Sequence, residues 1–151
     1  MAPKAVRIFL DSNVILSGFI SDRGAPRILL DLLSLDLPFL KSLTGRYNIM
    51  EIERNLTKKM PGCIPIYKRY LPKLNLEIIA LPSGDEIKKY AGTTADKDIP
   101  VLVSALKGKA DFLVTGDKKD FSHLKEAKIF PFKIASPSEF LAVIPDILKG
   151  G

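Results

Sequence analysis

The sequence predicts an α/β domain with a mainly parallel sheet that helices cover on both faces. Short apolar runs alternate with longer segments of helical periodicity from one end of the chain to the other, which is typical of βαβ units. The first run, Val6 to Leu10, is β-favouring and apolar as a buried strand would be. The 151 residues suit one domain, and we expect a single domain over residues 1–151.

Each element follows from its local pattern. Val6–Leu10 ends abruptly in Asp11-Ser12-Asn13, and apolar residues then continue at near-helical spacing to Phe19. Gly24-Ala25-Pro26 opens a clearer helix, and Met60-Pro61-Gly62 closes another that starts after Arg46. The expected strands are Val6–Leu10, Phe39–Leu43, Leu76–Leu81, Asp111–Thr115 and Ile129–Ile134. The expected helices are 14–19, 24–35, 47–59, 63–74, 83–90, 98–107 and a C-terminal helix from Ser136.

Composition excludes several classes of protein. A lone Cys63 and a lone His123 leave no intramolecular disulfide and no Cys/His zinc site. No apolar run approaches the ~20 residues that span a bilayer, and an acid and an amide follow the first apolar run where a signal peptide would stay apolar. We therefore expect a cytoplasmic protein without membrane association. The net charge of +6 and the pI of about 9.4 favour a polyanionic partner without establishing one.

Acidic residues stand where expected strands end. Asp11 and Asp117 directly follow strands, and Asp98 stands where Thr94-Ala95-Asp96-Lys97-Asp98 enters a helix. Ligands of open α/β sheets bind outside the carboxyl ends of the strands, and carboxylates gathered there repel one another unless a cation neutralises them. Hard ions such as Mg²⁺ prefer such oxygens. The competing interpretation is that each Asp caps the helix that follows it.

Three segments together resemble a known family. RIFLDSNVILSGF, MEIERNL and ADKDIPVLVSALKGKADFLVTGDKKDF, in that order, resemble the PIN domain, and most closely its prokaryotic branch that contains toxins of toxin–antitoxin pairs. The resemblance extends from about Val6 to Leu141. It implies a three-layer α/β/α sandwich with a mainly parallel central sheet, and an endoribonuclease that depends on Mg²⁺ or Mn²⁺.

The resemblance also implies roles for particular residues. The expected catalytic and metal-ligating acids are Asp11, Glu51, Asp98 and Asp117. Asn13 and Thr115 match accessory positions that hold water or orient a carboxylate, and Asp96 and Asp120 are secondary candidates. The segment after Asp117 is one residue longer than the family pattern, which weakens the case for Asp120.

Residue patterns alone leave three assignments open. Glu53 lies nearer than Glu51 to the apolar stripe of its helix, so only the family spacing selects Glu51. Of Asp96 and Asp98, the one that does not bind metal is expected to cap the helix. We expect the Ser12 hydroxyl to cap the first helix rather than to contact substrate.

Lysines share the sequence region of the acids. Lys97, Lys118 and Lys119 are the expected substrate contacts. Together with Lys107, Lys109 and Lys125 they predict an electrostatic funnel for single-stranded RNA, although each lysine alone is typical of a solvated surface.

The leading functional hypothesis is a metal-dependent endoribonuclease that cleaves single-stranded or structured RNA and is controlled by a small antitoxin. The alternative is a catalytically silent PIN-like module that binds RNA or protein. Two other classes of Mg²⁺-binding α/β protein are disfavoured. A phosphatase of the haloacid dehalogenase type needs a second Asp where this chain has Asn13, and a receiver domain needs paired acids that are absent before Asp11. The apolar helix Ile28–Leu35 favours a homodimer.

Overall fold

The computed structural model describes residues 4–116, 121, 124 and 130–150. Their strands form one five-stranded sheet in the order β3-β2-β1-β4-β5, and all its neighbouring strands run parallel. The strands are β1 (Val6–Leu10), β2 (Leu40–Gly45), β3 (Glu77–Ile79), β4 (Phe112–Val114) and β5 (Lys133–Ala135). The predicted parallel sheet is confirmed.

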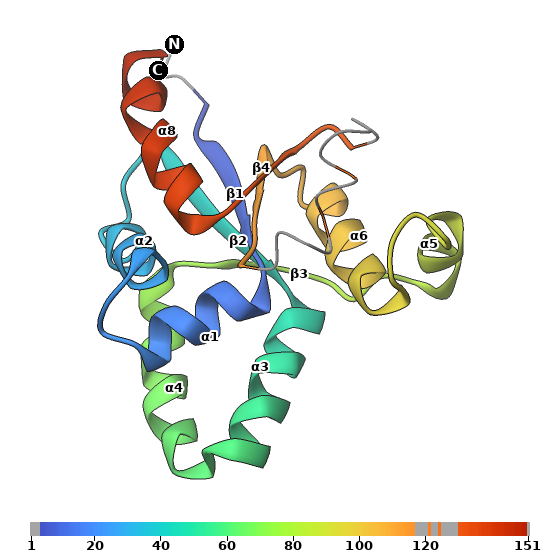
Figure 1. Cartoon of the computed structure of the whole chain (residues 1–151), viewed down its shortest axis with the longest axis horizontal. Coiled ribbons are helices and arrows are strands. Elements are labelled where there is room, and N and C mark those ends of the chain that lie inside the picture. Colours follow the sequence, from blue (N-terminus) through green and yellow to red (C-terminus); the bar gives the residue numbers. More distant parts are fainter. Residues whose placement is uncertain (1–3, 117–120, 122–123, 125–129, 151) are drawn as a thin grey trace.

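Helices follow strands β1, β2, β3 and β5 (Figure 1). They are α1 (Ser12–Ile20), α2 (Ala25–Leu33), α3 (Arg46–Lys59), α4 (Ile64–Tyr70), α5 (Gly84–Lys89), α6 (Ile99–Lys107) and α8 (Pro137–Gly150). Short 3₁₀ helices lie at Pro61–Cys63, Leu71–Leu74 and Asp96–Asp98. Within the described ranges, no helix is both long and apolar enough to cross a membrane.

The sheet separates two apolar cores, because successive side chains of a strand point to opposite faces. Ile8 and Leu10 of β1 belong to a core with residues of α1, α2 and α8, whereas Phe9 belongs to a core with residues of α6. All three β1 side chains are fully buried. The predicted three-layer α/β/α sandwich is therefore confirmed (Figure 1).

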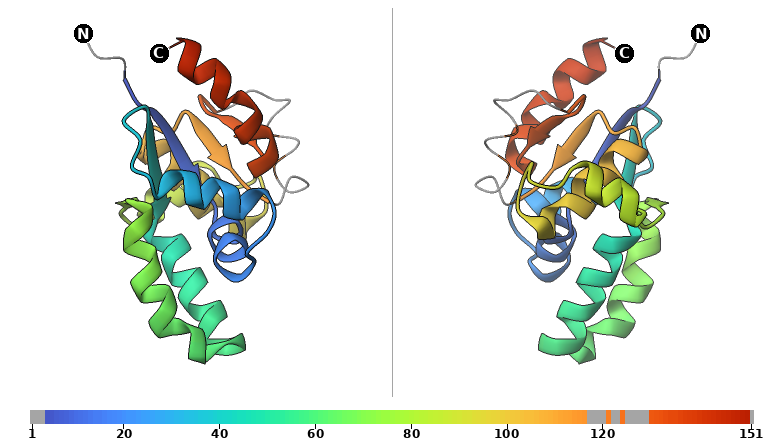
Figure 2. Two further views of the ribbon diagram at one scale, coloured as in Figure 1. Left: turned by 90° about the vertical axis from the view of Figure 1, so that its left-hand side faces the viewer. Right: turned by 90° about the vertical axis from the view of Figure 1, so that its right-hand side faces the viewer.

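The α3–α4 pair extends beyond the sheet (Figure 2). Helix α3 follows directly from the carboxyl end of β2, and Ile49, Ile52 and Leu56 are its buried apolar side chains. The predicted apolar stripe of this helix is thus confirmed. Because α1 also starts at the carboxyl end of its strand, α1 and α3 begin side by side at the same sheet edge.

Several predicted elements have bounds that are shifted by one or two residues, and two differ more from the structure. The expected helix over 63–74 is interrupted: α4 holds only Ile64–Tyr70, and 3₁₀ turns precede and follow it. Pro72 in the last of these turns has no N–H to continue an α-helical ladder. The last strand begins at Lys133, later than the predicted Ile129, because pairing with β4 sets its register at Phe112↔Lys133.

Candidate acidic site

Asp11 stands at the junction of β1 and α1. Its backbone N–H donates to the Val114 carbonyl at 2.9 Å, which ties it to β4. Its carboxylate caps α1, since Oδ1 accepts from the Ser12 N–H at 2.7 Å, and its Oδ2 accepts from Thr115 Oγ1 at 2.8 Å. Asp11 is 7% exposed. The structure therefore fixes both oxygens of a nearly buried carboxylate.

Burial governs the acidity of Asp11. Desolvation raises its pKa from 3.8 to about 6, the hydrogen bonds from Thr115 and Ser12 oppose the rise, and the charges of Glu51 and Asp98 add to it. The effect of Glu51 and Asp98 on this pKa shows that acids from three separate elements act on one another. Such pairwise repulsion is what a bound cation relieves.

A buried amide connects Asp11 with α3. Asn48 is fully buried, and its Nδ2 donates to Ser12 Oγ at 2.8 Å and to Asp11 Oδ1 at 3.3 Å. Its Oδ1 accepts from the Gly45 N–H at 3.2 Å. Asn48 thus joins the starts of α1 and α3 through hydrogen bonds to both.

Glu51 lies at the end of the same chain of contacts. Ser12 Oγ donates to Glu51 Oε1 at 2.8 Å, so the order is Asn48, Ser12, Glu51. The expected capping role of the Ser12 hydroxyl is wrong, because the Asp11 carboxylate caps α1 and the hydroxyl holds Glu51 instead. Glu53 faces α4, where its charge adds to the rise of the Tyr67 pKa to about 12 that burial mainly causes.

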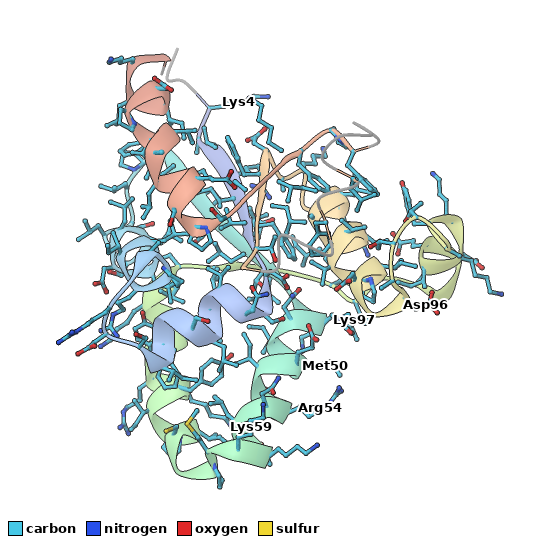
Figure 3. All side chains as sticks on the ribbon, in the orientation of Figure 1. Lys4, Met50, Arg54, Lys59, Asp96 and Lys97 are labelled. Atoms are coloured by element: carbon cyan, nitrogen blue, oxygen red, sulfur yellow. The ribbon has the colours of Figure 1, made fainter. Side chains whose placement is uncertain are left out.

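The acids line a pocket of about 200 Å³. The polar residues around it are Asp11, Ser12, Asn13, Glu51, Asn55, Lys97 and Asp98. Figure 3 shows Lys97 where the segment before α6 approaches α3, and Tyr47 Oη donates to the Lys97 carbonyl at 3.3 Å across this gap. Burial raises the pKa of the Tyr47 phenol, and the charges of Glu51, Asp98 and Asp11 add to this rise while Arg54 opposes it.

The structure separates the neighbouring acids Asp96 and Asp98. Asp98 lies in the pocket and at the N-cap position of α6, without a capping hydrogen bond from its side chain. Asp96 is exposed and outside the pocket lining. The structure gives Asp96 no capping contact to α6, so the expectation that one acid binds and the other caps is not met.

Two accessory predictions fall beside the acids. Thr115 donates to Asp11, as an orienting residue would. Asn13 Oδ1 accepts from the Gly116 N–H at 3.0 Å and so holds the end of β4 against α1. Asp117, Lys118, Lys119 and Asp120, together with His123 and Lys125, lie outside the described residues.

Asn48 and Asn55 were not predicted from the sequence. With Glu51 they are spaced by three and four residues, so they form a polar stripe beside the apolar stripe of α3. That spacing was the available signal for a polar face turned toward the site.

The lysine funnel is partly wrong. Lys97 lines the acidic pocket, but Lys107 and Lys109 lie in a different hollow with Arg7 and Lys41. The reason is that α6 carries the chain from the carboxyl edge of the sheet back to its amino edge, so lysines at the two ends of this helix lie on opposite sides of the molecule.

The donor set fits a hard divalent cation in type. The pocket offers carboxylate and amide oxygens and no sulfur or imidazole. Within the part of the chain that the structure describes, no group of three or more His, Cys, Asp or Glu side chains is placed so that it could hold a metal ion. The fold and the pocket define an α/β domain with an acidic site at the carboxyl edge of its sheet.

A family comparison agrees with this class. The family model described as "PIN domain" matches residues 7–119, and the chain belongs to the PIN domain family. No curated protein sequence matched the chain significantly.

Solved structures share the fold. The chain is similar to VapBC2 from Rickettsia felis bound to a DNA fragment from their promoter, with 16% identity, a TM-score of 0.58 and coverage of 87% of this chain and 98% of that chain. DNA-bound VapBC from Salmonella typhimurium gives 13% identity, a TM-score of 0.64 and coverage of 87% and 98%. VapBC-1 from nontypeable Haemophilus influenzae gives 16% identity, a TM-score of 0.62 and coverage of 88% of this chain and 99% of that chain.

Proposed function

We propose that this PIN domain protein is a Mg²⁺- or Mn²⁺-dependent endoribonuclease that cleaves single-stranded or structured RNA. One observation carries the proposal: Asp11, Glu51 and Asp98, from three separate elements, line one pocket at the carboxyl edge of the sheet. Each acid alone is compatible with a capping or surface role. Their convergence in one pocket, with an elevated pKa at Asp11, supports a cation site.

Asp11, Glu51, Asp98 and Asp117 would hold the cation. When bound, the cation lowers the pKa of a coordinated water and stabilises charge on the phosphate. The other residues position these acids: Thr115, the Ser12 N–H and Asn48 orient Asp11, and Ser12 Oγ orients Glu51. Asn13 holds the segment that leads to Asp117, and Asp96 lies outside the pocket lining.

Lysines attract the substrate toward an acidic pocket. Lys97 lines the pocket rim, and we assign phosphate contacts to it and to Lys118 and Lys119. Their ammonium groups draw in the RNA backbone without reading its sequence.

We further propose that the whole chain is one domain that acts as the toxin of a toxin–antitoxin pair in the cytoplasm, where its RNA substrates are. The support is the fold shared with the VapBC structures. A homodimer is supported by exposed apolar side chains on and after α2, where Ile28 is 58% and Leu35 is 66% exposed.

A cleavage assay tests the enzymatic proposal. Mixed single-stranded RNAs are incubated with the protein in Mg²⁺, Mn²⁺ or EDTA, beside Asp11→Asn. Asn keeps the size and capping ability of Asp11, and Thr115 Oγ1 can accept where it now donates, so the variant is expected to fold and to lose nearly all cleavage. Cleavage at the parent rate by Asp11→Asn would remove Asp11 from the site. RNA or protein binding without cleavage by the parent would support the silent module instead.

A further inference from the structure

A second hollow lies at the opposite edge of the sheet, where the parallel strands begin. Its volume is about 630 Å³. The charged residues that line it are Lys4, Arg7, Lys41, Glu77, Lys107 and Lys109. Figure 3 shows Lys4 at this end of the molecule and Lys59 at the other. Five cations against one anion make this hollow strongly basic, whereas the pocket at the carboxyl edge is acidic.

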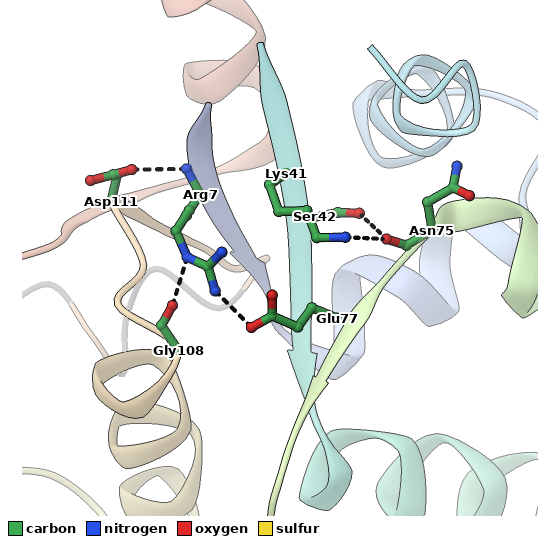
Figure 4. A network of polar contacts seen from close by, with 7 residues as sticks. All are labelled: Arg7, Lys41, Ser42, Asn75, Glu77, Gly108 and Asp111. Carbon is green, nitrogen blue, oxygen red and sulfur yellow. Dashed lines mark hydrogen bonds and ion pairs between the residues drawn. The ribbon is translucent and has the colours of Figure 1, made fainter. Parts of the chain in front are cut away.

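Arg7 lines this basic hollow and is already bonded to groups of the protein itself. Its Nη2 donates to Glu77 Oε2 at 2.7 Å, and its Nε donates to the Gly108 carbonyl at 2.8 Å (Figure 4). Its backbone N–H donates to Asp111 at 2.8 Å. Arg7 is therefore structural here, since it joins β1, β3 and the end of α6.

The lysines of the hollow differ in how far they are neutralised. Lys107 pairs with Glu86 at 3.3 Å. Lys41 Nζ donates to the Asn75 carbonyl at 3.3 Å, a contact that leaves its charge uncompensated (Figure 4). Lys4 and Lys109 are exposed. Ammonium groups from three chain segments thus surround one hollow.

Lys109 takes an unfavourable backbone conformation to reach this position. Its φ is +53°, in the left-handed region where glycine is normally found after a helix. The preceding Gly108 is itself closely packed, because a Cβ there would lie 3.0 Å from side-chain atoms of both Ile79 and Leu43. The chain therefore holds a lysine at the position where glycine would be more stable.

We propose that this basic hollow is a second docking site for the phosphate backbone of RNA, separate from the acidic pocket. Point charges on flexible stems suit sequence-independent contact with phosphates, and the guanidinium that could bind a planar group bidentately is occupied by Glu77. The proposal rests on the proposed function, in that the RNA held here is the substrate class of the acidic pocket.

The spacing of the two sites suits an extended RNA. Asp98 precedes α6 and Lys107 ends it, so at 1.5 Å per residue the two sites are separated by roughly 14 Å along this helix. Because most of α6 is buried, an RNA has to pass around it, so at about 3.4 Å per nucleotide in a stacked strand it needs more than roughly four nucleotides to contact both sites. An RNA much longer than this can contact both edges, whereas a shorter one contacts a single edge.

Equilibrium binding of RNA tests this site independently of catalysis. A labelled 20-nucleotide RNA is titrated in EDTA, over a series of salt concentrations, with the Asp11→Asn protein and with the same protein carrying Lys4→Gln, Lys41→Gln and Lys109→Gln. These changes leave the Arg7–Glu77 and Lys107–Glu86 pairs in place. We expect at least roughly tenfold weaker binding. The log–log salt slope should be smaller by about 2, since each phosphate that a lysine neutralises adds about 0.7 to it.

A matched variant removes the same charge elsewhere. Lys58, Lys59 and Lys68 are exposed on α3 and α4, and their replacement by Gln should change the slope much less. Equal losses in both triple variants would show a net-charge effect only and overturn the site. An unchanged salt slope in the triple variant of Lys4, Lys41 and Lys109 would overturn the site directly. The site would also be overturned if an acidic peptide displaced the RNA equally well from the Asp11→Asn protein and from this triple variant.

Lys109→Gly separates binding from folding. Glycine relieves the left-handed conformation, so the variant should be at least as stable as the parent while binding RNA more weakly. Parent-like RNA affinity in Lys109→Gly would exclude Lys109 from the docking site. Because all these measurements are made without cleavage, they stand even if the nuclease activity itself is absent.

Discussion

Asp11 carries a charge that folding removes from water. Its pKa of 3.8 in the unfolded chain rises to about 6 in the folded protein. Below pH 3.8 the carboxyl is protonated in both the folded and the unfolded chain, and its contribution to the free energy of unfolding is at its most favourable. As pH rises through 6 the folded protein must give up a proton that it holds more tightly than the unfolded chain does, so stability is lost.

This shift predicts a pH-dependent difference between the parent and Asp11→Asn. In EDTA, the free energy of unfolding of the variant minus that of the parent should increase by about 2–3 kcal/mol from pH 3.5 to pH 7.5, at about 1.36 kcal/mol per pKa unit. Urea unfolding at several pH values measures this. A difference that does not change with pH would contradict the buried, desolvated carboxylate.

The two glutamates of α3 give a matched pair of isosteric variants. Glu51 lies in the acidic pocket and accepts from Ser12, whereas Glu53 faces Tyr67. Glu51→Gln should lower RNA cleavage by at least roughly 10–100-fold, a loss typical even of residues that only support a metal ligand. Its thermal stability should stay the same or rise slightly because repulsion among the acids is relieved.

Glu53→Gln is the control for that variant. Its cleavage rate should remain within a few-fold of the parent, and any effect should be a small change in stability. If Glu53→Gln were inactive and Glu51→Gln active, the assignment of the α3 face to the pocket would be wrong. If both were active, the site would depend on the aspartates alone.

Among the elements, the start of α3 is what brings its polar stripe to Asp11. Gly45 makes this approach possible: a Cβ there would lie 2.7 Å from Asn48 Oδ1 and 3.1 Å from Ser104 Cβ. Because Asn48 is buried and hydrogen-bonded to Asp11 and Ser12, it cannot move aside without breaking those contacts. The packing of β2, α3 and α6 therefore depends on the absence of a side chain at this position.

Gly45→Ala should accordingly destabilise the fold by about 1–3 kcal/mol, the usual cost of overpacking, and should reduce cleavage because Asn48 and Glu51 shift together. Gly84→Ala is the control, since nothing lies within 4 Å of a Cβ there, and it should be neutral or stabilising. Thermal melts and cleavage rates compare the two. Equal stability of both variants would show that the α3 junction tolerates a side chain.

The elements that the sequence predicted best are those with strong local boundaries. β1 was predicted with the observed bounds because its apolar run stops at Asp11, which caps α1. The chain after Cys63 was harder, since prolines divide one apparent helix into α4 and its 3₁₀ turns. The last strand was misplaced because pairing with β4, rather than its own apolar residues, sets its start.

The site was predictable only as far as strand ends and family spacing reach. Asp11, Glu51 and Asp98 do share a pocket. Asn48 was missed because an Asn within a helix has no local reason to be buried; its partners Ser12 and Asp11 come from a distant part of the chain. Lys107 and Lys109 were misplaced because closeness in sequence to the acids hides the length of α6.

Across the whole molecule, the sheet separates opposite charges. Acids line the pocket at its carboxyl edge and five cations line the hollow at its amino edge, and the chain as a whole carries a net charge of +6. A polyanion is thus attracted to the surface in general, while the acidic pocket itself repels phosphate until a cation is bound. This division of charge makes cation binding the central requirement of the proposed chemistry.

Calorimetric titration of Mn²⁺ into the RNA-free protein tests that requirement without relying on catalysis. It should be performed on the parent, on the Asp11→Asn/Asp98→Asn double variant and on Glu53→Gln, with circular dichroism to verify folding. We expect saturable binding to the parent and to Glu53→Gln, with binding abolished in the double variant. Equal Mn²⁺ affinity in all three proteins, or no binding to the parent at millimolar Mn²⁺, would refute the cation site.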